Sequence, residues 1–343
     1  MAVSKLKKFI KQDLAMDLGT ANTLIYLQGE GVVLNEPTVI ALDQDDRVLQ
    51  VGGPAKTYLG RTPHGLKALR PLKDGVIEDF KAASLLIQAF ISKAKERKGI
   101  LSPRVAICVP SNITQVEKRA VYEAARTAGA KKIYLLEETM AAAIGAGLPI
   151  HDDRPKMVLD IGGGTTEIAV ISKAAYMVSE AIRVSGDEMD QAVTRWFLQN
   201  LGQQIGPNTA EKVKWKIGAV LPKPEYQDLS MEVYGKDLPA GGMPKGHKIN
   251  AHDLCPAFEE PVRAIVDLVD HTLKGLSHEV LLAIKEDGIT VTGGASLLRA
   301  LPEFLHQHTG VEFHLTEDPL TTVVKGAGKT IEEFKKYRDV FLN

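Results

Sequence analysis

The sequence predicts an α/β protein made of two related halves, because one strand–turn–strand pattern occurs twice. In the first copy the apolar run Leu14–Met16 leads into Asp17, a glycine-bearing turn and a second apolar run, Leu24–Leu27. In the second copy three apolar residues precede Asp160, which is followed by three glycines and the apolar run Ile168–Ile171. Short apolar runs bounded by turn residues are typical of buried strands. Two hairpins with an acid in the same place therefore predict a duplicated fold.

The chemistry of the two turns indicates phosphate binding. Glycines allow positive φ and close approach of a ligand to the backbone. Consecutive N–H groups in such a turn form a concave site for an anion. A carboxylate beside a phosphate is repelled unless a hydrated Mg²⁺ lies between them. The predicted nucleotide-binding residues are Gly19, Thr20, Ala21 and Asn22 of the first turn and Gly162, Gly163, Gly164 and Thr165 of the second, with Asp17 and Asp160 holding Mg²⁺ through water.

The two hairpins, Asp17-Leu-Gly-Thr-Ala-Asn-Thr and Asp160-Ile-Gly-Gly-Gly-Thr-Thr-Glu, resemble the two phosphate loops of the actin, Hsp70 and sugar-kinase superfamily. Other stretches resemble the MreB family of bacterial actins, and the similarity covers nearly the whole chain. These stretches are Leu34-Asn-Glu-Pro-Thr38, Arg70-Pro-Leu-Lys-Asp-Gly-Val-Ile77, Ala141-Ala-Ala-Ile-Gly-Ala-Gly147 and Val291-Thr-Gly-Gly-Ala-Ser-Leu-Leu298.

This resemblance implies an actin-like, duplicated RNase H-like fold with two domains, a central nucleotide cleft and a small insertion subdomain in each half. A polar break at residues 151–156 gives the predicted boundary. Domain I is expected to comprise 1–152 and 320–343, with its small subdomain at about 37–72. Domain II is expected to comprise 153–319, with its small subdomain at about 187–248.

Composition describes a globular protein with room for two domains. The chain has 343 residues, of which 44% are hydrophobic and 25% charged. A net charge of −1 gives no reason to expect nucleic-acid binding. We expect Cys108 and Cys255 to be reduced core thiols in a cytosolic protein. No apolar run reaches the roughly 18 residues of a membrane-spanning helix, and the N-terminus lacks the apolar core of a secretory signal.

The N-terminal segment has the pattern of a basic amphipathic helix. Its apolar side chains fall within an arc of roughly 120°, opposite four lysines, and such a segment can lie in a membrane interface. Ten residues are too few for a stable free helix, so a frayed basic tail is the alternative, although many copies on a polymer would add avidity. These apolar residues are Val3, Leu6, Phe9 and Ile10.

Members of the MreB family commonly reach the inner membrane in this way. The resemblance therefore implies a cytoplasmic protein that is peripheral at the inner face of the cytoplasmic membrane. In the family a hydrophobic loop adds a second membrane contact, which corresponds here to Ile100 and Leu101. Alternatively, these two residues pack under the next strand.

Between the hairpins the pattern predicts alternating strands and helices. Strands are expected at 32–34, 39–42, 105–109 and 132–136, and helices at 82–95 and 115–128. Residues 43–72 are predicted to form a small insertion, which by resemblance grips the neighbouring subunit in a filament. The strand at 132–136 ends at Glu137 and Glu138, and an alanine-rich helix over 140–145 follows.

Glu138 is the candidate for the hydrolytic residue. Open α/β sheets bind ligands beyond the carboxyl ends of their strands, and ATP hydrolysis needs a group that orients or deprotonates the attacking water. The resemblance assigns this role to Glu138, with Thr165 as its partner across the cleft. The alternative is that the acids only favour a helix N-terminus. The family usually has Pro where Thr139 stands, which leaves the rate of hydrolysis open.

In the second half, Glu211 and Lys214 share one face of a predicted short helix. The family uses the matching acid and base to accept from the ribose hydroxyls and to lie near the adenosine; the alternative is a solvated charge pair. A strand is predicted near 176–184, a helix over 187–201 opened by Gly186, and a hairpin within 222–248. The family often has Gly where Ser185 stands.

A third glycine turn follows the predicted strand 289–292, after a long helix over 258–276. Its residues Gly293, Gly294, Ala295 and Ser296 are expected to approach the nucleotide base. The family commonly has a third Gly at Ala295, whose methyl group fits only if φ is negative.

The C-terminal part is expected to return to the first domain over 319–324, and a terminal helix is predicted from Lys329. Lys325-Gly-Ala-Gly-Lys-Thr330 resembles a P-loop, but Val323 stands where that motif needs glycine, so a P-loop is rejected. The nine histidines form no convincing zinc face, and no structural metal is expected.

The leading hypothesis is an ATPase that uses Mg²⁺ and polymerises into filaments. By resemblance its partners are further copies of itself in paired filaments, the inner-membrane lipid surface and the cell-wall elongation machinery of rod-shaped cells. A sugar kinase of the same superfamily is one alternative, but no catalytic Asp with a polar sugar pocket is identified. A plasmid-type or magnetosome-type actin is the other alternative; the amphipathic start and the Glu137–Glu138 pair favour the cell-shape class.

Overall fold

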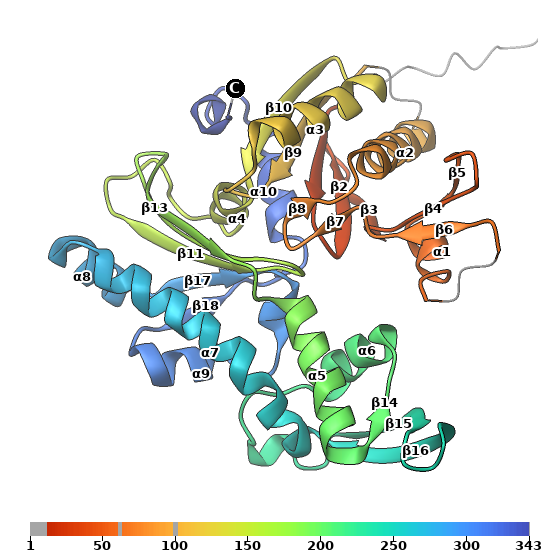
Figure 1. Cartoon of the computed structure of the whole chain (residues 1–343). Helices are drawn as coiled ribbons and strands as arrows, with labels where there is room; N and C mark the ends of the chain where they lie inside the picture. Colours follow the sequence, from red (N-terminus) through yellow and green to blue (C-terminus); the bar gives the residue numbers. More distant parts are fainter. Residues whose placement is uncertain (1–11, 61–63, 99–101, 343) are drawn as a thin grey trace, which may run out of the picture. The chain divides into compact units, whose positions relative to one another are not determined.

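Two five-stranded sheets, one in each half of the chain, form the framework of the fold (Figure 1). The computed structural model describes residues 12–60, 64–98 and 102–342. The chain divides into two compact units. Unit 1 comprises Met1–His151 and Thr321–Asn343, and unit 2 comprises Asp152–Leu320. The predicted membrane residues Val3, Leu6, Phe9, Ile10, Ile100 and Leu101 lie outside the described residues.

In unit 1 the sheet has the order β10-β9-β1-β2-β3. The first predicted hairpin is confirmed, since β1 and β2 pair antiparallel, whereas β9 pairs parallel with both β1 and β10. The strands are β1 (Leu14–Leu18), β2 (Asn22–Leu27), β3 (Gly31–Pro37), β9 (Arg104–Val109) and β10 (Lys132–Glu137).

Helices cover this sheet. Leu14, Met16 and Leu18 point into a core shared with α2 (Phe80–Lys98) and α3 (Gln115–Thr127). Side chains alternate between the faces of a strand, so Ala15 lies on the other face, near α10 (Thr322–Glu332), which packs on β1, β2 and β9.

Helix α10 begins at Thr322, so the predicted start at Lys329 is wrong. Glycines lower intrinsic helix propensity, which hides this helix in the sequence. A Cβ at Gly326 would overlap the backbone of Ala141 and Gly145 in α4 (Glu138–Gly145), and a Cβ at Gly328 would overlap the ring of Tyr26. The glycines of the rejected P-loop pattern therefore serve close helix packing.

The insertion in unit 1 carries a three-stranded sheet of order β5-β4-β6 with a small core of its own, formed by Val39, Ala41 and Ala55. A two-stranded hairpin follows before α2. The elements are β4 (Ile40–Leu42), β5 (Val48–Val51), α1 (Gly53–Lys56), β6 (Lys67–Leu69), β7 (Leu72–Lys73) and β8 (Val76–Ile77).

Unit 2 repeats the topology of unit 1, as the duplicated hairpins predict. Its sheet has the order β13-β12-β11-β17-β18, in which β11 and β12 pair antiparallel and β17 pairs parallel with β11 and β18. Read from the far end, this order matches β10-β9-β1-β2-β3 strand for strand. The strands are β11 (Lys156–Ile161), β12 (Thr166–Ser172), β13 (Ala175–Ile182), β17 (Ile289–Thr292) and β18 (Phe313–Leu315).

A second small sheet, β14-β15-β16, belongs to unit 2, and β15 and β16 form the hairpin predicted within 222–248. Helix α7 begins at Ala251, seven residues before the predicted start, because Asn250 and Asp253 form a capping box there. The elements are α5 (Gly186–Leu201), β14 (Gln203–Gln204), α6 (Pro207–Ile217), η1 (Pro224–Tyr226), β15 (Ser230–Asp237), β16 (Met243–Asn250), α7 (Ala251–Gly275), α8 (His278–Asp287), η2 (Gly294–Leu297), α9 (Leu301–Thr309) and, in unit 1, η3 (Arg338–Val340).

None of the helices in the described part of the chain combines the length and the apolar character needed to cross a membrane.

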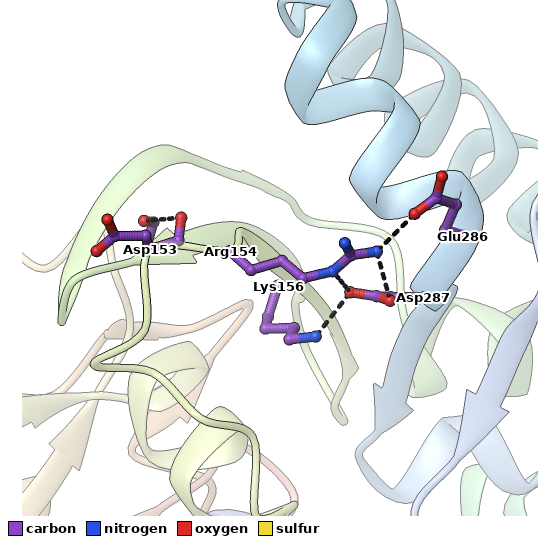
Figure 2. A network of polar contacts seen from close by, with 6 residues as sticks. Asp153, Arg154, Lys156, Glu286 and Asp287 are labelled. Carbon is purple, nitrogen blue, oxygen red and sulfur yellow. Dashed lines mark hydrogen bonds and ion pairs between the residues drawn. The ribbon is translucent and has the colours of Figure 1, made fainter.

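An ion-pair network fixes the start of unit 2 to the end of α8 (Figure 2). Arg154 donates to both carboxylate oxygens of Asp287, at 2.7 and 2.8 Å, and to Glu286 at 2.8 Å. Lys156 donates to Asp287 at 2.6 Å. The hydrogen bonds from Arg154 and Lys156 lower the pKa of Asp287 to about 2.

We expect Asp287→Asn to destabilise the protein at neutral pH by about 1 kcal/mol, the range of partly exposed ion pairs. The folded pKa of Asp287 lies below its unfolded value of about 3.9. Its contribution is therefore complete above pH 4 and is lost as the pH falls towards 2. Urea unfolding of both proteins at pH 7 and pH 3 should show the difference shrinking at pH 3; an equal difference at both values would contradict the assignment.

Candidate functional site: the phosphate turns of the two units

The first turn is held in shape by Thr38. The Thr38 hydroxyl donates to the carbonyl of Gly19 at 2.6 Å, and the Thr38 N–H donates to the carbonyl of Ala21 at 2.9 Å. Thr38 is fully buried. Gly19 has no room for a side chain, because a Cβ would lie 2.6 Å from the carbonyl oxygen of Asn22.

The segment around residues 70–77 supplies further contacts to this turn. The N–H of Gly75 donates to the Thr20 hydroxyl at 3.2 Å, and the guanidinium of Arg70 donates to the carbonyl of Ala21 at 3.4 Å. Thr38, Arg70 and Gly75 are not among the predicted site residues, although both stretches that contain them resemble the MreB family. Thr38 and Arg70 hold the backbone of the turn, whereas Gly75 holds the side chain of Thr20.

Asp17 and Glu138 lie at the same edge of the sheet in unit 1. Asp17 pairs in register with Cys108 of the neighbouring strand β9, and β10 on the other side of β9 ends at Glu137. Glu138 is the first residue of α4, and Thr139 beside it is fully buried. An acid in the first turn of a helix is also favoured by the helix dipole, so this placement is compatible with both interpretations of Glu138.

The second turn is bound to the N-terminus of α5. The carbonyl of Gly162 accepts from the Ser185 hydroxyl at 2.5 Å and from the N–H of Gly186 at 3.2 Å. The carbonyl of Gly163 accepts from the N–H of Asp187 at 2.7 Å. In a planar trans peptide the C=O and the following N–H point in opposite directions. The N–H groups of Gly163 and Gly164 therefore both point away from α5, and consecutive N–H groups can bind an anion.

Asp160 precedes this turn as a buried carboxylate. Only 7% of its surface is exposed, and burial raises its pKa to about 6. Among the residues that the structure describes, no basic side chain offsets this burial. Gly293 of the third turn lies so close that a Cβ there would overlap Oδ1 of Asp160. A buried carboxylate without a compensating cation fits a hydrated Mg²⁺ ion, whose charge would restore the ionised form.

Gly186 is the point at which three predicted site elements of unit 2 meet. A Cβ on Gly186 would lie 3.1 Å from the carbonyl oxygen of Gly162, 3.3 Å from Nζ of Lys214 and 3.4 Å from Cβ of Ala295. The structure thus brings together the second turn, the predicted adenosine-contacting lysine and the third turn. Sequence patterns identify Gly186 only as the start of a helix.

Lys214 is buried and already partnered. Its Nζ donates to the carbonyl of Gly186 at 2.7 Å and pairs with Asp190 at 2.9 Å. Burial raises the pKa of Asp190 to about 6, against the opposing effect of Lys214. Lys214 is therefore not a solvated surface charge, and the alternative of a solvated Glu211–Lys214 charge pair is wrong for this residue. Its contact with adenosine stays a prediction. Glu211, three residues earlier on α6, is half-buried.

The third turn has the backbone that its residues require. Gly293 has φ of 87°, a value that favours glycine. Ala295 lies inside the 3₁₀ helix η2, where φ is negative, so its methyl group is accommodated. The Ser296 hydroxyl donates to the carbonyl of Gly293 at 2.6 Å and closes the turn.

Comparison with known protein families gives a match over almost the entire chain. The family model described as MreB/Mbl protein matches residues 11–339. The cell shape-determining protein MreB of Escherichia coli K12 is 46% identical over 336 residues, covering 95% of this chain and 96% of that protein. The cell shape-determining protein Mbl of Bacillus subtilis 168 is 39% identical over 326 residues, covering 95% and 97%.

Comparison with solved structures also gives matches over almost the entire chain. MreB5 of Spiroplasma citri bound to ADP superimposes with a TM-score of 0.88 at 32% identity, covering 96% of this chain and 98% of that one. The same protein is also known bound to AMPPNP, with a TM-score of 0.87. A MamK double helical filament gives a TM-score of 0.79 at 20% identity, which shows the shared fold alone.

Proposed function

Because the chain belongs to the MreB/Mbl family of actin-like proteins, we propose that it binds and hydrolyses ATP and polymerises into membrane-associated filaments that maintain rod cell shape. The observation that carries this proposal is the duplicated sheet topology with a glycine turn after the same strand of each unit. The identity of 46% to a cell shape-determining relative supports the cell-shape class.

ATP is the proposed nucleotide. Relatives bound to ADP and AMPPNP support adenine nucleotides. The turns at 19–22 and 162–165 would receive the phosphates. Glu211 and Lys214 would contact the nucleoside, and the turn at 293–296 would lie against the base. Mg²⁺, when bound, would neutralise phosphate charge, and Asp17 and Asp160 would hold it through water.

Glu138 is the proposed general base for hydrolysis, with Thr165 as its partner. The carboxylate of Glu138 would accept a proton from water as the water oxygen forms a bond to the γ-phosphorus. The bond from that phosphorus to the β–γ bridging oxygen then breaks and releases ADP and phosphate. Thr139, in place of the family's usual Pro, would give the start of α4 a different backbone constraint and thereby affect the rate.

The two units are the proposed domains. Domain I would comprise 1–152 and 320–343 with a small subdomain at about 37–72. Domain II would comprise 153–319 with a small subdomain at about 187–248. The division of the chain into units at His151/Asp152 and Leu320/Thr321 supports these boundaries.

The proposed partners are further copies of the chain, the inner-membrane lipid surface and the membrane proteins of the cell-wall elongation machinery. The family relationship supports self-assembly. The basic amphipathic pattern of residues 2–11 supports lipid binding, and the protein would thus be cytoplasmic and peripheral at the membrane.

A pelleting assay with vesicles tests assembly and membrane binding together. We expect the full chain to pellet with ATP and Mg²⁺ at micromolar concentration and to carry vesicles rich in anionic lipid into the pellet. A chain that lacks residues 1–11 should still pellet but bring down severalfold fewer vesicles, because each lost lysine contributes about 1 kcal/mol at an anionic surface. Neutral phosphatidylcholine vesicles are the control.

Equal vesicle recovery with and without residues 1–11 would contradict the membrane assignment and leave the assembly assignment intact. A full chain that stays in the supernatant with ATP, yet transfers phosphate to a sugar, would instead identify a kinase.

A further inference from the structure

Ser185 makes an unusual contact for a residue that precedes a helix. It occupies the N-cap position of α5 with extended backbone, and only 1% of its surface is exposed. A serine at this position normally accepts a hydrogen bond from the first turn of its own helix, but Ser185 makes no such bond. Its hydroxyl instead donates to the carbonyl of Gly162 in the second phosphate turn, at 2.5 Å.

This hydrogen bond controls the direction of one particular N–H group. The Gly162 carbonyl and the Gly163 N–H belong to the same planar peptide, so the carbonyl cannot rotate without turning the N–H. The backbone N–H of Gly186 holds the same carbonyl more loosely, at 3.2 Å. The Ser185 hydroxyl is thus the shorter of two restraints on a peptide that lies between glycines and has little steric restraint of its own.

We propose that Ser185 is a positioning residue for phosphate recognition: its hydroxyl fixes the Gly162–Gly163 peptide so that the Gly163 N–H stays directed at the bound phosphate. The inference rests on the proposed ATP binding and adds a residue that the turn motif does not contain. A glycine at this position, which is common in the family, has no hydroxyl. The carbonyl of Gly162 would then accept a hydrogen bond only from the N–H of Gly186.

Ligands with and without phosphates separate this role from a general structural one. We would measure by titration calorimetry the binding of ATP with Mg²⁺, and of adenosine, to the wild type, Ser185→Ala and Ser185→Gly. Loss of one neutral hydrogen bond should raise the Kd for ATP about threefold to tenfold. The Kd for adenosine should stay unchanged, because adenosine carries no phosphate for the amides of the turn to bind.

Thr309→Ala is a matched control in the same unit. The Thr309 hydroxyl donates to the carbonyl of Leu305 at 2.9 Å within α9, so this variant also loses one hydroxyl hydrogen bond. It should bind both ligands as the wild type does. Ser185→Gly removes the same hydroxyl but leaves a different residue, so the same result in both variants would assign the effect to the lost hydroxyl.

An unchanged Kd for ATP in both Ser185 variants would overturn the inference, as would an equal loss of affinity for ATP and adenosine. In either case wild-type ATP binding would still stand. A wild-type protein that binds no ATP would overturn the proposed function itself, so the two failures are distinguishable.

Discussion

Replacing Asp160 by asparagine is expected to abolish pelleting of the protein with ATP and Mg²⁺. The amide has the shape of the carboxylate but no charge to hold a hydrated cation. Outer-shell groups of metal sites typically account for about 10–100-fold in metal affinity, so binding of Mg²⁺-ATP should weaken by a similar factor. Calorimetric titration with Mg²⁺-ATP, together with the pelleting assay, measures both effects.

The same variant should not lose stability in the absence of nucleotide. Burial raises the pKa of Asp160 to about 6, above its unfolded value of about 3.9. An acid with a raised folded pKa destabilises the folded state increasingly as the pH rises from 4 through 6. Asp160→Asn removes this penalty, so at pH 8 it should unfold at a higher urea concentration than the wild type.

Asp153→Asn is the control for this comparison. Asp153 is an exposed acid of the same unit, with 84% of its side chain accessible, and it pairs with Lys173. It should pellet and unfold as the wild type does. If Asp160→Asn pelleted and bound Mg²⁺-ATP as the wild type does, the magnesium assignment would be wrong.

The second large effect is expected for Glu138→Gln, which should slow ATP hydrolysis by about 100-fold or more while ATP binding persists. Glutamine can still hold a water by hydrogen bonding but cannot take its proton, and general-base contributions are typically 10²–10⁴-fold. Phosphate release under saturating ATP gives kcat, and calorimetry with AMPPNP gives affinity. Filaments of this variant should persist longer after ATP addition, because the triphosphate state is retained.

Glu137→Gln provides the matched comparison, since it changes the neighbouring acid at the end of β10 in the same way. We expect its kcat to stay within a few-fold of the wild type. The opposite order, with Glu137→Gln inactive and Glu138→Gln active, would transfer the role to Glu137. Equal activity of both variants would support the helix-dipole interpretation of the two acids.

Local sequence signals predict the hairpins of both sheets well. Apolar runs of strand length, an acid and a glycine turn occur within about a dozen residues, and their pairing is antiparallel and local. The duplicated topology follows, because the same signals occur in both halves. The third turn and the strand Ile289–Thr292 are correctly predicted for the same reason.

Elements that depend on distant partners are predicted less well. The start of α10 at Thr322 is missed, because Gly326 and Gly328 argue against a helix until the backbone of α4 and the ring of Tyr26 are known to lie against them. The start of α7 at Ala251 is also missed, because Pro256 and Pro261 inside the helix argue against a helix there.

The candidate site shows the same difference between local and distant signals. Residues inside the turn motifs are identified from sequence, whereas the residues that hold the turns are not. Thr38, Arg70 and Ser185 act through hydrogen bonds that they donate to backbone carbonyls. Every residue has a backbone carbonyl, so no residue type marks the acceptor of these hydrogen bonds. The contacts can therefore be identified only from the structure. Resemblance to the family at residues 34–38 and 70–77 was the available signal for two of them.

The contact between α4 and α10 has a mechanical consequence. Gly326 and Gly145 bring the backbones of α10 and α4 into direct contact, with no side chains between them. A small displacement of one helix therefore cannot be absorbed by side-chain rotamer changes. Glu138 begins α4. A displacement of α10 is therefore expected to displace α4, and with it the carboxylate of Glu138.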